Sequence, residues 1–385
     1  GQPDLNWDNP RVREDIYDLM RFWLHRGVDG FRMDVINQIS KPQGLPDDEE
    51  PWPGTQAGFR YYTNGPNVHS YLQEMNRKVL SQFDVVSIGE MHATDPDEAL
   101  RYVAPEREEL NMIFHFEHMV LDAGPGGKWD PQPIRIDDLK AVFSRWQTAM
   151  HDRGWNSLFL NNHDYPRMVS RFGDDGRYHA ESAKLLAGVT YLMQGTPFLF
   201  QGEEIGMTNA RFESIEPYRD VDTLNFYREQ RDAGAEEQEI MRRIHAASRD
   251  NARTPFQWNA EPGAGFTTGT PWIPLNPNYE SINLADQWGR DGSIVEFYRR
   301  LFRLRKESPA ALYGNYELIT DASSPLFAYR RRSEEQIITV VANFSAEERS
   351  APASTRRGHV ALANYEDGSA NLGALRPWEL VVLVE

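Results

Sequence analysis

Three short segments of this sequence end on a carboxylate and together could break a glycosidic bond. They are Val28-Asp-Gly-Phe-Arg-Met-Asp34, Ser87-Ile-Gly-Glu-Met91 and Phe159-Leu-Asn-Asn-His-Asp164. Each is an apolar run of strand-forming residues, and such strand tips converge on the upper rim of a parallel sheet or barrel. Glycosidic cleavage needs one ionised carboxylate as nucleophile and one protonated carboxyl as acid. Asp34, Glu90 and Asp164 are therefore the candidate catalytic residues.

The residues around the first two carboxylates predict different protonation states. Arg32 lies two positions before Asp34, so both side chains point to the same side of a strand, and a guanidinium lowers the pKa of a neighbouring carboxyl. Glu90 has only apolar neighbours in sequence, which raises the pKa of a carboxyl and suits a proton donor. The structural alternatives are a plain Arg–Asp ion pair and a solvated glutamate at a strand end.

The third segment also allows two interpretations. His163 could hydrogen-bond a sugar hydroxyl while Asp164 stabilises the reacting ring, with Arg167 orienting Asp164. The alternative is an Asn-rich turn with a capping aspartate, which is frequent in proteins.

Composition excludes several classes of function. The 385 residues carry a net charge of −17 and no cysteine. Nucleic acid and anionic membranes are therefore not expected as partners, and neither are disulfides, thiol catalysis or cysteine-bound metal. No apolar run approaches the roughly 18 residues of a membrane-spanning helix. We expect a cytoplasmic protein without a metal site in this chain.

The elements that must position these carboxylates alternate between strands and helices up to about residue 305. Helices are predicted at 11–24, 68–80, 96–102, 136–151, 180–194 and 292–307 from apolar spacing. Strands are predicted around Phe31, Ile88, Phe114, Phe159 and Leu199, with a long loop at 41–66 and a polar insertion after residue 200. Residues 313–385 predict a small antiparallel β-sandwich. The domain boundaries are accordingly 1–312 and 313–385.

Taken together and in order, the motifs resemble the α-amylase family, glycoside hydrolase family 13. Within it the chain is most similar to the oligo-1,6-glucosidase, dextran glucosidase and α-glucosidase group. Further matching stretches are Val35-Ile-Asn-Gln-Ile-Ser-Lys41, Phe116-Glu-His118, Gln201-Gly-Glu-Glu-Ile-Gly-Met207, Ser248-Arg-Asp-Asn-Ala-Arg-Thr-Pro-Phe-Gln-Trp258, Phe266-Thr-Thr-Gly-Thr-Pro-Trp272 and Asn276-Pro-Asn-Tyr279.

The resemblance implies a role for each matching residue. Asp34 would be the nucleophile, Glu90 the acid/base and Asp164 the stabiliser. The residues implied in substrate binding are Arg32, Val35, Phe116, Lys128, His163 and Arg249. Of these, Lys128 would contact the leaving sugar, and Val35 resembles the α-1,6-specific members. His92-Ala93 and Tyr165 depart from the group's pattern, which leaves the acceptor preference open.

The resemblance also implies a fold. The five strands would be strands 4–8 of a (β/α)8 barrel, and an N-terminal segment or separate chain would complete the barrel. That part would hold any structural divalent cation and the carboxylate partner of Arg249. No cofactor is expected to be required.

The leading interpretation is a retaining, exo-acting α-glucosidase on short α-1,6-linked and also α-1,4-linked glucosides, with transglucosylation as a possible side reaction. The enzymatic alternatives are a sucrose isomerase and a trehalose-6-phosphate hydrolase. The non-enzymatic alternative is an inactive glucosidase-like binding subunit, which the presence of all three carboxylates disfavours.

Overall fold

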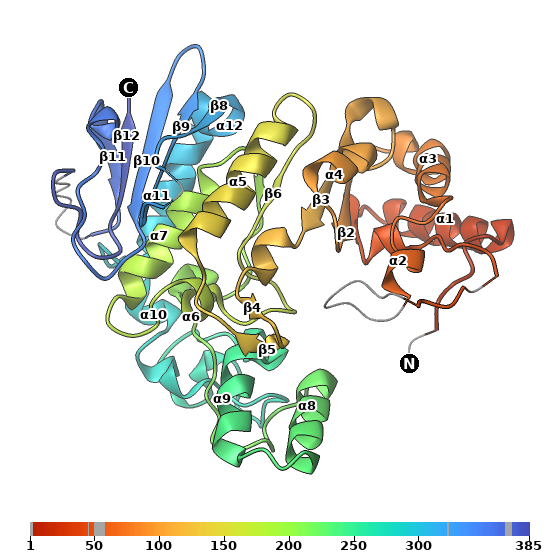
Figure 1. The fold of residues 1–385 in the computed structure, drawn as a ribbon, viewed down its shortest axis with the longest axis horizontal. Coiled ribbons are helices and arrows are strands. Elements are labelled where there is room, and N and C mark those ends of the chain that lie inside the picture. The colour runs from red at the N-terminus through yellow and green to blue at the C-terminus, as the bar shows by residue number, and fades with distance from the viewer. Residues whose placement is uncertain (1–2, 45, 50–57, 322, 366–371) are drawn as a thin grey trace. The chain divides into compact units, whose positions relative to one another are not determined.

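The computed structural model describes residues 3–44, 46–49, 58–321, 323–365 and 372–385 (Figure 1). The chain divides into two compact units, one of residues 1–118 and 145–157 and the other of residues 119–144 and 158–385. The chain crosses between the units three times: after His118, within α5 (Ile136–Met150) and within β6 (Ser157–Leu158). The predicted 41–66 loop falls partly outside the described residues.

The first unit is built on a three-stranded parallel sheet. Its strands are β1 (Gly30–Met33), β2 (Val86–Met91) and β3 (Met112–His115), in that order. Gly30 faces Val86 across β1 and β2, and a Cβ on Gly30 would lie 2.1 Å from the Val86 carbonyl oxygen. The glycine that precedes the first carboxylate therefore allows the two strands to pair.

Helices connect these strands, as predicted. The Asn9 side chain accepts a hydrogen bond from the Arg11 N–H and Pro10 lies in the first turn, which are the expected start signals of the first helix. The helices of this unit are α1 (Pro10–Leu24), α2 (Phe59–Tyr62), α3 (Val68–Lys78) and α4 (Pro96–Val103).

The second unit contains the remaining helices. The predicted strands around Phe159 and Leu199 appear as β6 and β7 (Thr196–Pro197), which pair with each other. A hairpin is formed by β4 (Ala123–Gly124) and β5 (Gly127–Pro131). The helices are α6 (Met168–Phe172), α7 (His179–Tyr191), α8 (Val221–Asp232), α9 (Glu237–Ala247), α10 (Leu284–Gln287), α11 (Ile294–Lys306) and α12 (Pro309–Tyr313).

The polar insertion after residue 200 is more ordered than predicted, because it contains α8 and α9. Phe226, Tyr227, Ile240 and Ile244 from these helices are buried in one cluster with Phe212. The apolar residues are few and the charged residues many, so the helical spacing is weak in the sequence. The sequence signal that could have revealed α8 is its N-cap residue, Asp220.

The C-terminal part is an antiparallel sheet, which confirms that element of the prediction. Phe327 and Tyr329 of β9 pack on one face with α7, whereas Leu326 and Ala328 belong to a cluster on the other face. The described strands form one sheet in the order β11-β12-β10-β9-β8. They are β8 (Asn315–Leu318), β9 (Leu326–Arg332), β10 (Ile337–Asn343), β11 (His359–Ala363) and β12 (Leu380–Val384).

Gly188 in α7 allows this helix to pack against the sheet. A Cβ at Gly188 would lie 2.2 Å from Leu380 Cδ2 in β12. Gly188→Ala should therefore lower the free energy of unfolding by about 1–3 kcal/mol through overpacking, although alanine is favoured over glycine within helices by about 1 kcal/mol. Thermal unfolding measures the change, and adding Leu380→Val should restore part of it. A more stable Gly188→Ala protein would contradict this packing.

Candidate active site

In the first unit, one guanidinium holds two of the three candidate carboxylates. Arg32 Nη1 lies 2.5 Å from Asp34 Oδ1, and Arg32 Nη2 lies 2.8 Å from Glu90 Oε2. The predicted pairing of Arg32 with Asp34 is therefore confirmed. The apolar, uncompensated setting inferred for Glu90 from its sequence neighbours is corrected, because the Arg32 guanidinium reaches Glu90 from the neighbouring strand. Sequence neighbours alone could not reveal this contact.

The environment of Glu90 favours its protonated form. Burial raises the pKa of this carboxyl, and the adjacent Asp34 carboxylate raises it further by hydrogen bonding and charge. The Arg32 charge and the Val35 N–H, 3.2 Å from Glu90 Oε2, lower the pKa but do not outweigh burial. The net pKa lies above that of an ordinary glutamate. Glu90 can therefore carry a proton at a pH where exposed carboxylates are ionised.

A pH profile tests this balance. In Arg32→Gln the cation that lowers the pKa of Glu90 is lost, so the pKa should rise further. If Glu90 must be protonated to act as an acid, the alkaline limb of kcat/KM should move to higher pH, whatever the loss in rate. Arg21→Gln, on an exposed Arg–Asp pair of α1, is the control and should leave the limb in place. A limb unchanged in Arg32→Gln would show that Arg32 does not act on the titrating acid.

The backbone beside the candidate nucleophile is strained. Val35 has φ 38° and ψ 45° at the start of the short 3-10 helix η1 (Ile36–Gln38). A β-branched residue with positive φ is an outlier, and such conformations cost on the order of 1–3 kcal/mol. The Val35 N–H donates to Glu90, so this strained turn ties the end of β1 to the candidate acid.

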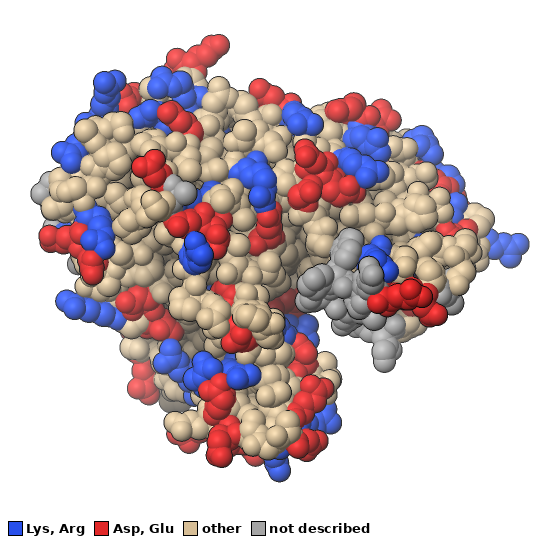
Figure 2. Space-filling model, viewed as in Figure 1, with Lys and Arg blue, Asp and Glu red and all other residues tan. Residues whose placement is uncertain are grey.

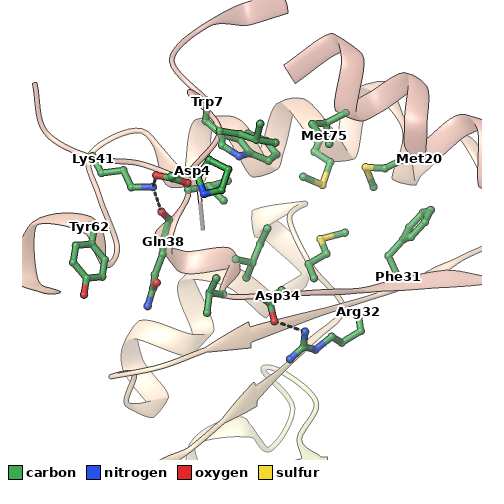
Figure 3. Close-up of a pocket in the computed structure, with 17 residues that line it drawn as sticks. Asp4, Trp7, Met20, Phe31, Arg32, Asp34, Gln38, Lys41, Tyr62 and Met75 are labelled. Carbon is green, nitrogen blue, oxygen red and sulfur yellow. Dashed lines mark hydrogen bonds and ion pairs between the residues drawn. The ribbon is translucent and has the colours of Figure 1, made fainter. Parts of the chain in front are cut away.

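Asp34 and Arg32 also line a pocket of about 550 Å³ in the first unit (Figure 3). Phe31 points toward Met20 and Met75, and the Arg32 side chain extends to the other side of β1. The pocket volume lies in the range of small-molecule sites. The Asp34 side chain is 72% exposed, so a ligand could reach its carboxylate.

Phe116, a predicted substrate contact, is buried just after β3. Its ring stacks on His92, with centroids 4.4 Å apart and an interplanar angle of 17°. His92 is the more accessible ring of the pair. A role of Phe116 in substrate binding stays a prediction.

In the second unit, Asp164 lies among cations. Arg253 Nη2 is 2.9 Å and Arg249 Nη1 is 3.5 Å from Asp164 Oδ1, while His163 Nε2 is 3.5 Å from Asp164 Oδ2. The Asp164 N–H donates to Asn162 Oδ1, so the segment is also the Asn-rich turn of the alternative interpretation. The turn and the charged cluster are compatible, because the turn uses the backbone and the cluster uses the side chains.

Arg249 has a carboxylate partner in this unit, so the expectation that its partner would come from a missing part is wrong. Arg249 Nη2 and Nε lie 2.6 and 3.0 Å from Asp220 Oδ1. Asp220 is buried and caps α8 through Thr223. Burial opposes its ionisation, but the hydrogen bonds from Arg249 and Thr223 outweigh burial, and the pKa of Asp220 is lowered.

The expectation that Arg167 orients Asp164 directly is also wrong. Its guanidinium is buried on backbone carbonyls, and Arg253 is the residue that pairs with Asp164. Arg253 and Asp220 are thus the two residues at this cluster that sequence reasoning missed. Arg253 lies four residues after Arg249, but nothing in that spacing shows which carboxylate it meets.

Lys128, the implied contact to the leaving sugar, lies in β5. Its ammonium pairs with Asp222 of α8 and lies 4.7 Å from the centre of the Trp129 ring. Trp129 stacks on Phe226 with centroids 4.2 Å apart. This arrangement holds a half-exposed cation beside an aromatic pair.

The described residues, 3–44, 46–49, 58–321, 323–365 and 372–385, contain neither a metal-binding cluster nor a membrane-spanning helix. Within those ranges, no group of three or more His, Asp or Glu side chains is arranged to hold a metal ion. No described helix has the length and apolar character needed to cross a membrane. Acidic and basic side chains are interspersed on the face shown in Figure 2.

Comparison with known proteins identifies the family. Residues 1–314 match the model of the α-amylase catalytic domain. The chain therefore belongs to the α-amylase family, and the predicted family barrel fold with a C-terminal antiparallel sheet is confirmed.

Particular relatives are close in sequence and structure. The chain is 50% identical over 391 residues to an oligo-1,6-glucosidase of Parageobacillus thermoglucosidasius, covering 98% of this chain and 69% of that protein. It is 44% identical to the crystallised trehalose-6-phosphate hydrolase of Bacillus licheniformis, with a TM-score of 0.92, covering 99% of this chain and 69% of the other. For the isomaltulose synthase of Klebsiella sp. LX3 the identity is 37% and the TM-score 0.92, covering 100% and 70%.

Proposed function

We propose that this protein is a retaining, exo-acting α-glucosidase that hydrolyses short α-1,6-linked glucosides, with hydrolysis of α-1,4 bonds and transglucosylation as secondary activities. The observation that carries the proposal is the pair of carboxyls on Arg32, one exposed and one buried with a raised pKa. Two carboxyls in different environments are the arrangement that glycosidic cleavage requires. The oligo-1,6-glucosidase relative, at 50% identity, supports the linkage.

The proposed mechanism has two steps. Asp34 attacks the anomeric carbon while Glu90 protonates the departing glycosidic oxygen, which gives a covalent glycosyl-enzyme. Glu90 then accepts a proton from the water that hydrolyses this intermediate, and Asp34 is released. An inverting enzyme would need about 6.5–9.5 Å between the carboxyls to admit a water. A retaining enzyme has its two carboxyls about 5–5.5 Å apart. Asp34 and Glu90 share one guanidinium and lie closer together than the inverting range, which favours retention over inversion.

The remaining roles rest on the family resemblance. Asp164 would stabilise the charged ring in the transition state, and Arg32, His163 and Arg249 would contact the glucose unit that is cleaved off. Lys128 and Phe116 would contact the substrate as well, Lys128 on the leaving sugar. No step of this scheme calls on a cofactor, and we propose that none is required.

Product analysis tests the proposal against its alternatives. The protein is incubated separately with isomaltose, maltose, sucrose and trehalose 6-phosphate, and products are followed by proton NMR. We expect glucose from isomaltose, appearing first as the α-anomer. Isomaltulose from sucrose would indicate an isomerase, and glucose 6-phosphate from trehalose 6-phosphate would indicate the phosphate-specific enzyme. Binding without turnover of all four sugars would indicate an inactive subunit.

The phosphate alternative has less structural support. A phosphorylated sugar needs cations with capacity for its charge. The side chains of Arg32, Arg249, Arg253 and Lys128 are each engaged with a carboxylate. Because these cations are already paired, a neutral glucoside is the favoured substrate.

Val35 is the proposed determinant of linkage preference. Val35→Thr keeps the branched shape beside Asp34 but adds a hydroxyl, so it should shift the ratio of kcat/KM from isomaltose toward maltose. Changes of this size in a pocket are worth about 1–3 kcal/mol, or about 10- to 200-fold. Val360→Thr, on an exposed position of β11, is the matched control. An unchanged ratio of kcat/KM for isomaltose and maltose in Val35→Thr would show that Val35 does not determine linkage preference.

We also propose that the chain supplies strands 4–8 of the family barrel and that a further polypeptide segment pairs with β1. Two observations support this: in the described part of the chain β1 pairs with β2 alone, and the chain spans 69% of the oligo-1,6-glucosidase. An unpaired parallel edge invites pairing. Native mass spectrometry of the protein from its source tests for that segment. We also propose that the protein is cytoplasmic, which cell fractionation tests. A chain of this mass alone, hydrolysing isomaltose fully, would contradict the completing segment.

A further inference from the structure

Arg167 is a buried cation whose side chain donates to three backbone carbonyls on two separate segments of the second unit. Its Nη1 donates to the carbonyl of Gln201 at 2.5 Å, its Nε to Asn251 at 3.2 Å and its Nη2 to Ala252 at 3.2 Å. Its own N–H donates to Asn209 Oδ1 at 2.8 Å. The side chain is 1% exposed. Such burial of a charge is costly unless its hydrogen bonds are satisfied.

These contacts link Arg167 to Asp164 indirectly, through residues 249–253. Arg167 lies three residues after Asp164, on the same loop. Its guanidinium holds the carbonyls of Asn251 and Ala252, which lie in the chain between Arg249 and Arg253. The side chains of these last two arginines return to Asp164 Oδ1. Two sets of contacts therefore fix the distance between the Asp164–Arg167 loop and residues 249–253. One set is the hydrogen bonds from the Arg167 guanidinium, and the other is the ion pairs of Arg249 and Arg253 with Asp164.

We infer that Arg167 is a positioning residue that fixes the orientation of Asp164 by holding the Arg249–Arg253 segment at the distance its ion pairs require. Arg167 does not touch the carboxylate, and it acts through Arg253, which also donates to the His163 carbonyl. The same residue thus determines where both His163 and Asp164 lie.

The shape of the guanidinium explains why arginine occupies this position. Its five N–H donors lie in one rigid plane and can reach three carbonyls in different directions, whereas a lysine ammonium is a point donor on a flexible stem. Arg167→Lys should keep the positive charge but lose at least one of the three carbonyl contacts. The loop of residues 249–253 should then move relative to Asp164.

The chain offers a matched control in Arg305 of α11. Its guanidinium is also buried and donates to three backbone carbonyls, those of Tyr191, Met193 and Gly195. Burial lowers the pKa of Arg167 and of Arg305 alike, to about 10 in each case. Arg305→Lys therefore removes the same kind of interaction at a place without contact to Asp164.

The kinetic test is a double-mutant cycle, and it rests on the proposed function. Arg167→Lys should lower kcat for a nitrophenyl α-glucoside about 10- to 100-fold, as a displaced positioning group does, with a smaller change in KM. In an Arg253→Met background, Arg167→Lys should lower kcat less than threefold, because its effect passes through Arg253. Arg305→Lys should cost the same small factor in both backgrounds. Additive losses for Arg167→Lys and Arg253→Met would overturn the inference.

Crystal structures of the two lysine variants give a readout without activity. We expect the Arg253–Asp164 pair to be broken or lengthened in Arg167→Lys and intact in Arg305→Lys. An intact pair in both would overturn the inference even if the protein hydrolyses glucosides. If the wild type cleaves no glucoside, the proposed function fails while the structures still decide the role of Arg167. If Arg167→Lys does not fold, Asn209→Ala, which removes the acceptor of the Arg167 N–H, takes its place in both tests.

Discussion

Asp34→Asn should abolish glucoside hydrolysis. Asparagine keeps the size of the side chain but cannot form the glycosyl ester, so the covalent route is closed. The loss should be on the order of 10⁶-fold in kcat, the size seen when the nucleophile of another covalent hydrolase is removed. The measurement is the initial rate on isomaltose, with Asp29→Asn, an exposed aspartate just before β1, as the control with normal activity.

Chemical rescue separates the loss of a nucleophile from a loss of folding. In Asp34→Gly, added azide should attack from the side that the carboxylate occupied and yield a β-glucosyl azide from an activated α-glucoside. Unrescued variants that bind glucose normally would argue that Asp34 only holds Arg32 in place. Retention of more than a few per cent of activity in Asp34→Asn would remove it as nucleophile.

Glu90→Gln should lower kcat for isomaltose by about 10²- to 10⁴-fold, the usual contribution of a general acid. A nitrophenyl glucoside has a leaving group that needs no proton, so its first step should be nearly preserved. Hydrolysis of the glycosyl-enzyme still requires a base, so the variant should release a burst of nitrophenolate and then slow down. Rapid-mixing absorbance measurements detect the burst.

Glu109→Gln is the matched control for this variant. Glu109 is also buried in the first unit and is paired with Arg107 and His69. Its replacement should affect stability without changing the relative rates on the two substrates. Equal losses on isomaltose and on the nitrophenyl glucoside in Glu90→Gln, with no burst, would exclude Glu90 as the proton donor.

The sequence predicted the features that are local to a few residues. Strands β1, β2 and β3 were found because each is a short apolar run that stops at a polar tip, and α1 because its cap and apolar spacing agree. The pairing of Arg32 with Asp34 follows from their separation by two in a strand. The family resemblance then supplied roles that spacing could not.

What the sequence could not predict depends on contacts between distant segments. The approach of Arg32 to Glu90 crosses from β1 to β2, and the pairs of Asp220 with Arg249 and of Arg253 with Asp164 join residues 29 and 89 positions apart. The helices α8 and α9 were hidden because their buried faces are narrow. Which cation meets which carboxylate is decided by packing of whole elements, and no single window of sequence contains that information.

Because Asp220 has two roles, protonation of its carboxylate at low pH should weaken two interactions together. Its side chain caps α8 and holds Arg249, and its pKa is lowered. Since the folded-state pKa is depressed, its contribution is complete above the ordinary pKa of an aspartate and is lost only as the pH falls through the lowered value. Acid should therefore loosen the first turn of α8 and break the Arg249–Asp220 ion pair in the same pH range, because both depend on the one ionised carboxylate of Asp220.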